Sequence, residues 1–163
     1  ENMMINNFGF IKELISLSIF FSTYSLSEKL GDLTRQQSIE KSIFLMGNIG
    51  ENHYFEPNIL KFSTGKLYKL KIINKSDSKH YFSSNSFSRS IYTRKIQIIK
   101  NGQKISEIKG NIFEIEVFPG NIVEWWFIPI KTGIFNDLKC MVKDQKSKKI
   151  HSDMGMVGTI IID

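Results

Sequence analysis

The chain has 163 residues, of which 41% are hydrophobic and 12% aromatic, and its formal net charge is +6 at pH 7. This length suits a single domain with a sizeable core, and the apolar and aromatic content excludes a chain that is disordered throughout. The single cysteine excludes an internal disulfide framework and any metal site that needs two cysteines. The basic residues are mostly lysines spread along the chain, which favours a solvated surface over a nucleic-acid face.

The N-terminal region is typical of an export signal. Residues 14–26 are uncharged and mostly apolar, which matches the core of a signal peptide and is too short to cross a bilayer. Small residues at Ser25 and Ser27 suit cleavage before Glu28. We therefore expect residues 1–27 to be a signal peptide and the protein to be periplasmic, with no stable membrane span after cleavage. The alternative is an amphipathic helix or an uncleaved anchor, which would leave the protein attached to the membrane.

The rest of the chain predicts an all-β domain. Residues 28–42 are polar and are expected to form a linker or N-terminal extension. Over residues 43–163, short apolar runs alternate with turn signals, which favours an antiparallel sandwich or barrel. Asn101-Gly102 is typical of a tight hairpin, since both residues tolerate a positive φ. The predicted strands are residues 43–46, 59–62, 67–73, 95–100, 104–108, 112–118, 122–128 and 157–162.

The potential metal ligands are few, and they gather near the end of the chain. Cys140, His151 and Met156 fall within 17 residues, and the other two histidines are His53 and His80. Two imidazoles and a thiolate with a weak axial thioether form the ligand set of a blue-copper electron-transfer site. A lone cysteine or methionine is more often an ordinary core residue, so the ordered set, and no single member, favours copper.

The C-terminal sequence resembles the cupredoxin family, the plastocyanin-like and azurin-like type 1 copper proteins. In that family a strand with a glycine–aromatic pattern leads to the cysteine, as Gly133-Ile-Phe leads to Cys140 here. The family's final strand opens with a histidine, four residues, a methionine, one residue and a glycine. His151, Met156 and Gly158 match this ending in register.

An upstream segment extends the resemblance to residues 43–162. The stretch from Phe55 to Gly65 resembles the family segment that precedes the strand before the first histidine ligand, and here it leads to His80. His53 has no counterpart in this pattern and is expected to be a loop residue. The resemblance implies a Greek-key β-sandwich of the cupredoxin type that binds one copper ion. The implied ligands are His80, Cys140, His151 and Met156.

The resemblance also implies a function. We expect an exported one-electron carrier that is not an enzyme in its own right. Its partner would be a redox protein, which the lysines could steer if that partner is acidic, and no nucleic acid is expected. Met154 is not expected to bind the metal, because Met156 is the methionine that matches the motif.

Two other functions stay open. Ten residues separate Cys140 from His151, more than in the small electron carriers, and residues 143–149 are rich in lysine. A loop of this kind that opens the site would favour a periplasmic copper-binding or delivery protein without redox shuttling. The second alternative is a metal-free β-sandwich used for interaction, in which Cys140 is buried and inert. A carboxylate in place of the axial thioether would give a red copper site, but the motif favours the methionine.

Overall fold

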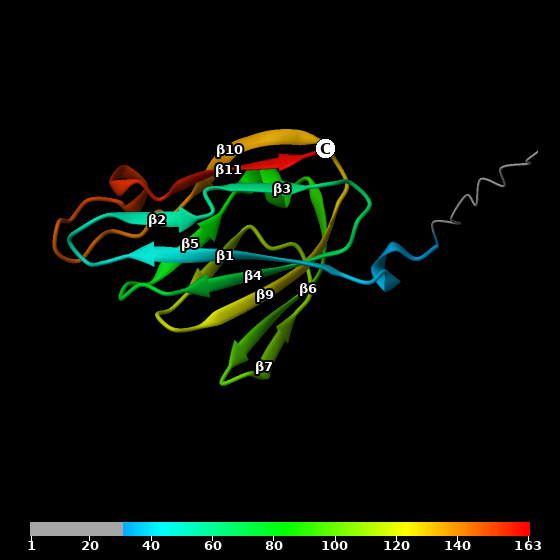
Figure 1. Cartoon of the computed structure of the whole chain (residues 1–163), viewed down its shortest axis with the longest axis horizontal. Helices are drawn as coiled ribbons and strands as arrows, with labels where there is room; N and C mark the ends of the chain where they lie inside the picture. The colour runs from blue at the N-terminus through cyan, green and yellow to red at the C-terminus, as the bar shows by residue number, and fades with distance from the viewer. Residues whose placement is uncertain (1–30) are drawn as a thin grey trace, which may run out of the picture.

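The computed structural model describes residues 31–163, so the predicted signal peptide at residues 1–27 lies outside the described part of the chain. Two β-sheets pack face to face and form nearly all of the regular structure of these residues (Figure 1). The all-β prediction is confirmed. Within residues 31–163 no helix is both long and apolar enough to cross a membrane.

The first sheet has six strands. In spatial order they are β2 (His53–Glu56), β1 (Ile39–Gly47), β4 (Tyr68–Asn74), β9 (Ile122–Pro129), β6 (Ile91–Lys100) and β7 (Gln103–Ile108). Most neighbours are antiparallel as expected, but β1 and β4 run parallel. β1 begins at Ile39, inside the segment 28–42 that was expected to be a linker.

The second sheet has five strands. In spatial order they are β3 (Ile59–Phe62), β11 (Val157–Ile162), β10 (Gly133–Lys139), β5 (His80–Ser83) and β8 (Glu114–Val117). The pair β11 and β3 is parallel, and the other pairs are antiparallel. The described residues also contain the short helices η1 (Leu33–Arg35), α1 (Asn85–Ser88) and η2 (His151–Met154).

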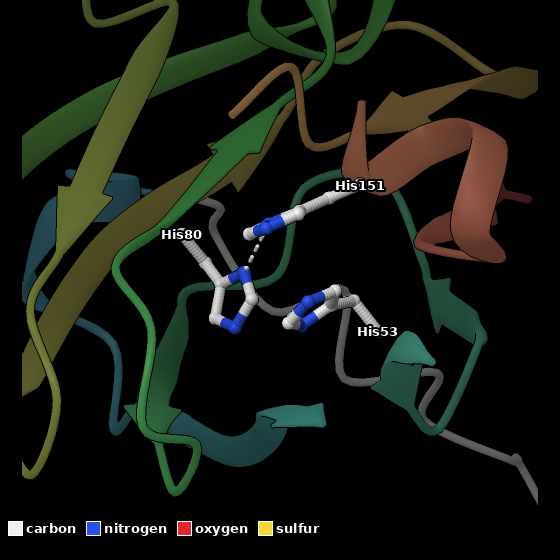
Figure 2. A group of neighbouring side chains, drawn as sticks. All are labelled: His53, His80 and His151. Atoms are coloured by element: carbon white, nitrogen blue, oxygen red, sulfur yellow. Dashed lines mark hydrogen bonds between the residues drawn. The ribbon is translucent and has the colours of Figure 1, made fainter. Parts of the chain in front are cut away.

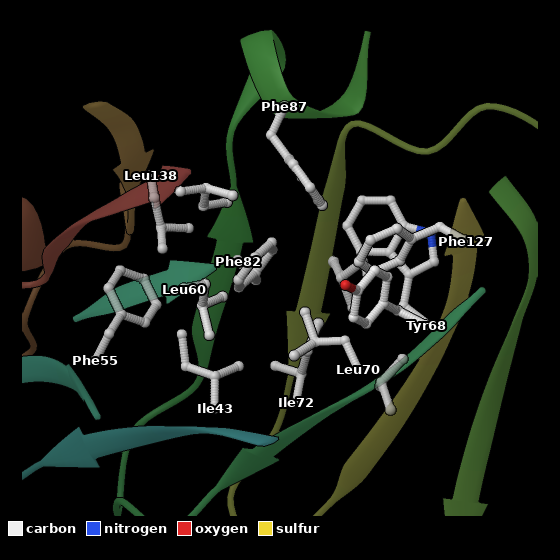
Figure 3. Packing of buried hydrophobic residues seen from close by; sticks show 14 of the residues in the cluster. Ile43, Phe55, Leu60, Tyr68, Leu70, Ile72, Phe82, Phe87, Phe127 and Leu138 are labelled. Atoms are coloured by element: carbon white, nitrogen blue, oxygen red, sulfur yellow. The ribbon is translucent and has the colours of Figure 1, made fainter. Parts of the chain in front are cut away.

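The core lies between the two sheets and is rich in aromatic rings (Figure 3). Strand β4 alternates buried and half-buried residues, as a strand with one face on the core should. Trp125 is buried, its ring meets Phe82 and Phe87 edge-on, and its indole N–H donates to the Thr93 hydroxyl. Edge-to-face pairs of this kind contribute about 0.5–1.5 kcal/mol each beyond simple burial. The packed aromatic core makes a rigid base for the loops at the ends of the strands.

Candidate metal centre

Two neighbouring strands bring Cys140 and His80 together. His80 is the first residue of β5, and Cys140 directly follows β10, which pairs with β5. The Tyr81 backbone N–H donates to Cys140 Sγ at 3.2 Å, and the Cys140 N–H donates to the Met156 carbonyl at 3.2 Å. The side chains of Cys140 and His80 are both fully buried. The strand register thus places the thiol beside the imidazole, although the two residues are 60 positions apart.

A single helical turn connects His151 to Met156. The 3-10 helix η2 runs from His151 to Met154 and is capped by Gly155, whose φ of 109° is a conformation that residues with a side chain rarely adopt. The Met156 N–H then donates to the His151 carbonyl at 2.9 Å, and β11 begins at the next residue. Met156 is fully buried in the core cluster next to the loop that carries His151. The four residues that separate His151 from Met156 in the sequence motif are therefore the residues of this helical turn.

Three predicted ligands converge with the spacing that a metal ion requires. Cys140 Sγ lies 3.8 Å from His80 Nδ1 and 3.6 Å from His151 Nδ1, and the two Nδ1 atoms are 3.0 Å apart. The centre of a triangle with these sides is about 2.0 Å from each atom, close to the roughly 2.0–2.3 Å bonds that imidazole and thiolate make to Zn²⁺. The donor atoms therefore fit a single transition-metal ion of the type 1 copper kind.

Hydrogen bonds fix the orientation of the His80 ring. His80 Nε2 lies 2.7 Å from the Ser76 hydroxyl, which in turn lies 2.8 Å from Asn74 Oδ1. The buried Asn74 amide donates to the carbonyls of Ser78 and Val117, both at 2.8 Å. If Nδ1 faces the metal, Nε2 carries the proton and donates to Ser76. Partners of this kind hold a ligand histidine in one tautomer and one orientation.

The electrostatics keep both histidines neutral. Burial, followed by the nearby rings of His151 and His53, lowers the pKa of His80 to about 3. Burial and His53 lower the pKa of His151 to about 4, against an opposing effect of Asp144. Burial raises the pKa of the Cys140 thiol, although the Tyr81 N–H opposes this. The imidazole lone pairs are thus available at neutral pH, whereas a metal ion must displace the proton of the thiol.

These shifts predict that the metal-free protein loses stability in mild acid. The folded-state pKa of His80, about 3, lies below the value of about 6.5 in an unfolded chain, so the unfolded state binds more protons between these limits. Stability therefore falls as the pH drops below about 6.5, by on the order of 2 kcal/mol between pH 7 and pH 5 for His80 alone. Urea unfolding of the metal-free protein measures this change. A free energy of unfolding that stays constant from pH 7 to pH 5 would contradict it.

His53 was expected to be a loop residue, and this is wrong. It begins β2, is fully buried, and forms a group with His80 and His151 in which one ring nitrogen from each lies within 4.8 Å of the others (Figure 2). Its ring stacks on His151 with 3.7 Å between the ring centroids and 23° between the planes. Gly47 makes room for it, since a Cβ there would lie 2.7 Å from His53 Nδ1. The sequence motif gave no indication of this third histidine.

The loop between Cys140 and His151 is folded around a buried carboxylate. Asp144 accepts hydrogen bonds from the backbone N–H groups of Lys146 and Ser147 within the loop, and from that of Gly50 in the turn between β1 and β2. Its other contact is His53 Nε2 at 3.3 Å. Burial acts to raise the pKa of Asp144, but the hydrogen bonds outweigh it and hold the pKa well below its usual range. The lysine-rich loop is therefore tied through Asp144 to the β1–β2 turn and to the histidine group.

No protein-family model and no curated protein matches this chain. Solved structures do match, among them a multicopper oxidase from Pediococcus acidilactici with a TM-score of 0.56 and 18% identity, covering 78% of this chain and 27% of that one. A laccase from Botrytis aclada has a TM-score of 0.54 and 12% identity, covering 77% and 29%. A copper nitrite reductase from Nitrosomonas europaea has a TM-score of 0.53 and 10% identity, covering 80% and 51%.

These neighbours overturn the expectation that the protein is not an enzyme in its own right. All three are enzymes, and this chain spans between about a quarter and a half of their length, so it corresponds to a part of each. The matched parts share the two-sheet sandwich described above. The chain therefore has the cupredoxin fold that the resemblance in its sequence implied.

Proposed function

We propose that the chain binds one copper ion and passes one electron at a time. Cys140, His80 and His151 would hold the ion, with Met156 as a weaker fourth ligand. The observation that carries this proposal is the triangle of 3.0, 3.6 and 3.8 Å between the thiol sulfur and the two Nδ1 atoms. Bound copper supplies the Cu(II)/Cu(I) couple.

The surroundings of the ligands support rapid electron transfer. The Tyr81 N–H holds Cys140 Sγ, and the network through Ser76 holds the His80 ring, so neither side chain is free to turn when the charge at the site changes. Soft sulfur favours Cu(I) and imidazole favours Cu(II), so this mixed set suits both states. A site that rearranges little between two redox states has a low barrier to electron transfer.

The burial of the ligands favours electron transfer over copper delivery. Cys140, His80 and His151 are each 0% exposed, and the loop between Cys140 and His151 is tied to the neighbouring β1–β2 turn through Asp144. A delivery protein needs ligands that an acceptor can reach. The proposal covers both a free carrier and an electron-relaying domain of a larger copper enzyme, since both need the same couple. We further propose an exported protein with an acidic redox partner, which a net charge of +6 would attract.

Copper titration of the whole chain tests the proposal. We expect one Cu(II) per chain, an intense visible thiolate-to-copper band and a narrow copper hyperfine splitting in the EPR spectrum. Repeated reduction and reoxidation should leave the metal in place, because the ligands are buried. A weak, ordinary Cu(II) spectrum would exclude a thiolate-bound site, and loss of copper to a protein acceptor on reduction would favour delivery.

A further inference from the structure

The His53 side chain belongs to the histidine group, but its geometry does not suit a ligand. An ion bound to His151 Nδ1 would lie in the plane of that ring, because the nitrogen lone pair lies there. The His53 ring is stacked on the face of His151, 3.7 Å away and only 23° from parallel. A nitrogen lone pair of His53 lies in the plane of its own ring, so it would point alongside an ion held by His151 and not at it.

Asp144 fixes the His53 ring from its outer edge. His53 Nε2 lies 3.3 Å from Asp144 Oδ2, and both side chains are completely buried. The carboxylate is held in place by the backbone N–H groups of Gly50 and Ser147, which favour its ionised form. An ionised carboxylate can only accept, so His53 Nε2 carries a proton and donates it. This nitrogen has no lone pair left for a metal. The other ring nitrogen, Nδ1, has no hydrogen-bond partner within the described residues and lies against the backbone of Gly47, in the plane of a ring that is stacked on His151.

The pair also joins two segments that are far apart in the sequence. Gly50 lies in the turn between β1 and β2, and His53 is the first residue of β2. Asp144 lies in the loop between Cys140 and His151. The contacts of Asp144 tie these segments together beside His53, whose ring is stacked on that of His151. His151 Nε2 has no hydrogen-bond partner within the described residues. The His151 ring is therefore held by the contacts of its Nδ1 with His80 and Cys140 and by the His53 ring stacked on its face.

We propose that His53, anchored by Asp144, is a positioning residue of the copper centre that fixes the plane of His151 without binding the ion. This inference rests on the proposed function. It gives the long loop between Cys140 and His151 a role, because this loop carries the carboxylate that anchors the positioning ring. Outer partners of metal ligands typically contribute about 10–100-fold in metal affinity.

The test compares four forms of the whole chain loaded with Cu(II): wild type, His53→Ala, His53→Phe and Asp77→Asn. Pulsed EPR counts the coordinated imidazoles, and we expect two in each form. His53→Ala should shift the thiolate-to-copper band, widen the copper hyperfine splitting and lower copper affinity by about 10–100-fold. His53→Phe keeps a ring on His151 but loses the anchor, so it should shift the band in the same direction by less.

Asp77→Asn is the matched control. Asp77 accepts the Ile49 N–H at 3.0 Å, so it anchors the same turn as Gly50 without touching His53. It should leave the band and the hyperfine splitting unchanged. Three coordinated imidazoles in the wild type, or a His53→Phe spectrum identical to that of the wild type, would overturn the proposal. The second comparison holds even if His53→Ala does not fold.

A measurement on the metal-free protein separates this inference from the proposed function. Long-range ¹⁵N–¹H NMR spectra report which ring nitrogen carries a proton, and we expect Nε2 of His53 to be protonated. A proton on Nδ1 alone would overturn the role of Asp144. A wild-type copper complex without the thiolate band would contradict the proposed function, while the NMR result would still decide whether Asp144 anchors His53.

Discussion

Replacing Cys140 with serine is expected to remove the intense thiolate-to-copper band while the domain stays folded. Serine fits the same buried position, and its hydroxyl can accept the Tyr81 N–H that now bonds the sulfur at 3.2 Å. A hydroxyl does not lose its proton to a metal at neutral pH as readily as a thiol does, so the charge-transfer donor is lost. The histidines remain, and Cys140→Ser should bind Cu(II) more weakly with an ordinary, wide hyperfine splitting.

Proton release gives a second readout of the same substitution. Burial raises the pKa of the Cys140 thiol, whereas the pKa values of His80 and His151 lie well below neutral. Copper binding at pH 7 should therefore release about one proton from the wild type and none from Cys140→Ser. A pH-sensitive dye in weak buffer measures this. A Cys140→Ser protein that keeps the intense band would contradict thiolate ligation, and circular dichroism checks that the variant is folded.

The sequence was sufficient to predict the all-β fold and to single out the local segment from His151 to Met156. Strand β9 (Ile122–Pro129) nearly matches the predicted strand at residues 122–128, because its long apolar run is bounded by clear turn signals. The spacing of His151 and Met156 reflects a local turn that ends at Gly155. Both features depend on neighbours in the sequence, so both can be recognised there.

The strands that build the site could not be predicted in the same way. β2 and β5 have four residues each, and β10 contains Asn136 and Asp137, types that are rare in strands. These strands form because they pair with neighbouring strands, so their own sequences do not predict them well. His53 and Asp144 meet across 91 positions, and no motif spacing reveals such a contact. The one feature of the sequence that pointed to this contact was Asp144 itself, the single acidic residue within the lysine-rich residues 143–149.

Replacing Met156 with glutamine is expected to lower the reduction potential of the copper centre. Met156 is the residue that follows the His151 turn, and its backbone bonds both His151 and Cys140. An amide oxygen is a harder ligand than a thioether, so it stabilises Cu(II) relative to Cu(I). A tenfold relative stabilisation corresponds to about 59 mV for a one-electron couple, and we expect a decrease of at least that size. Cyclic voltammetry of the copper-loaded protein measures it.

Met154→Gln is the matched control, because Met154 is the methionine that the motif excludes. Its sulfur accepts the Ser147 hydroxyl at 3.3 Å, so its contact lies within the loop. The potential should stay at the wild-type value in Met154→Gln and fall in Met156→Gln. The reverse order would assign the axial position to Met154. No change in either variant would indicate a three-coordinate site, in which the planar ligands alone set the potential.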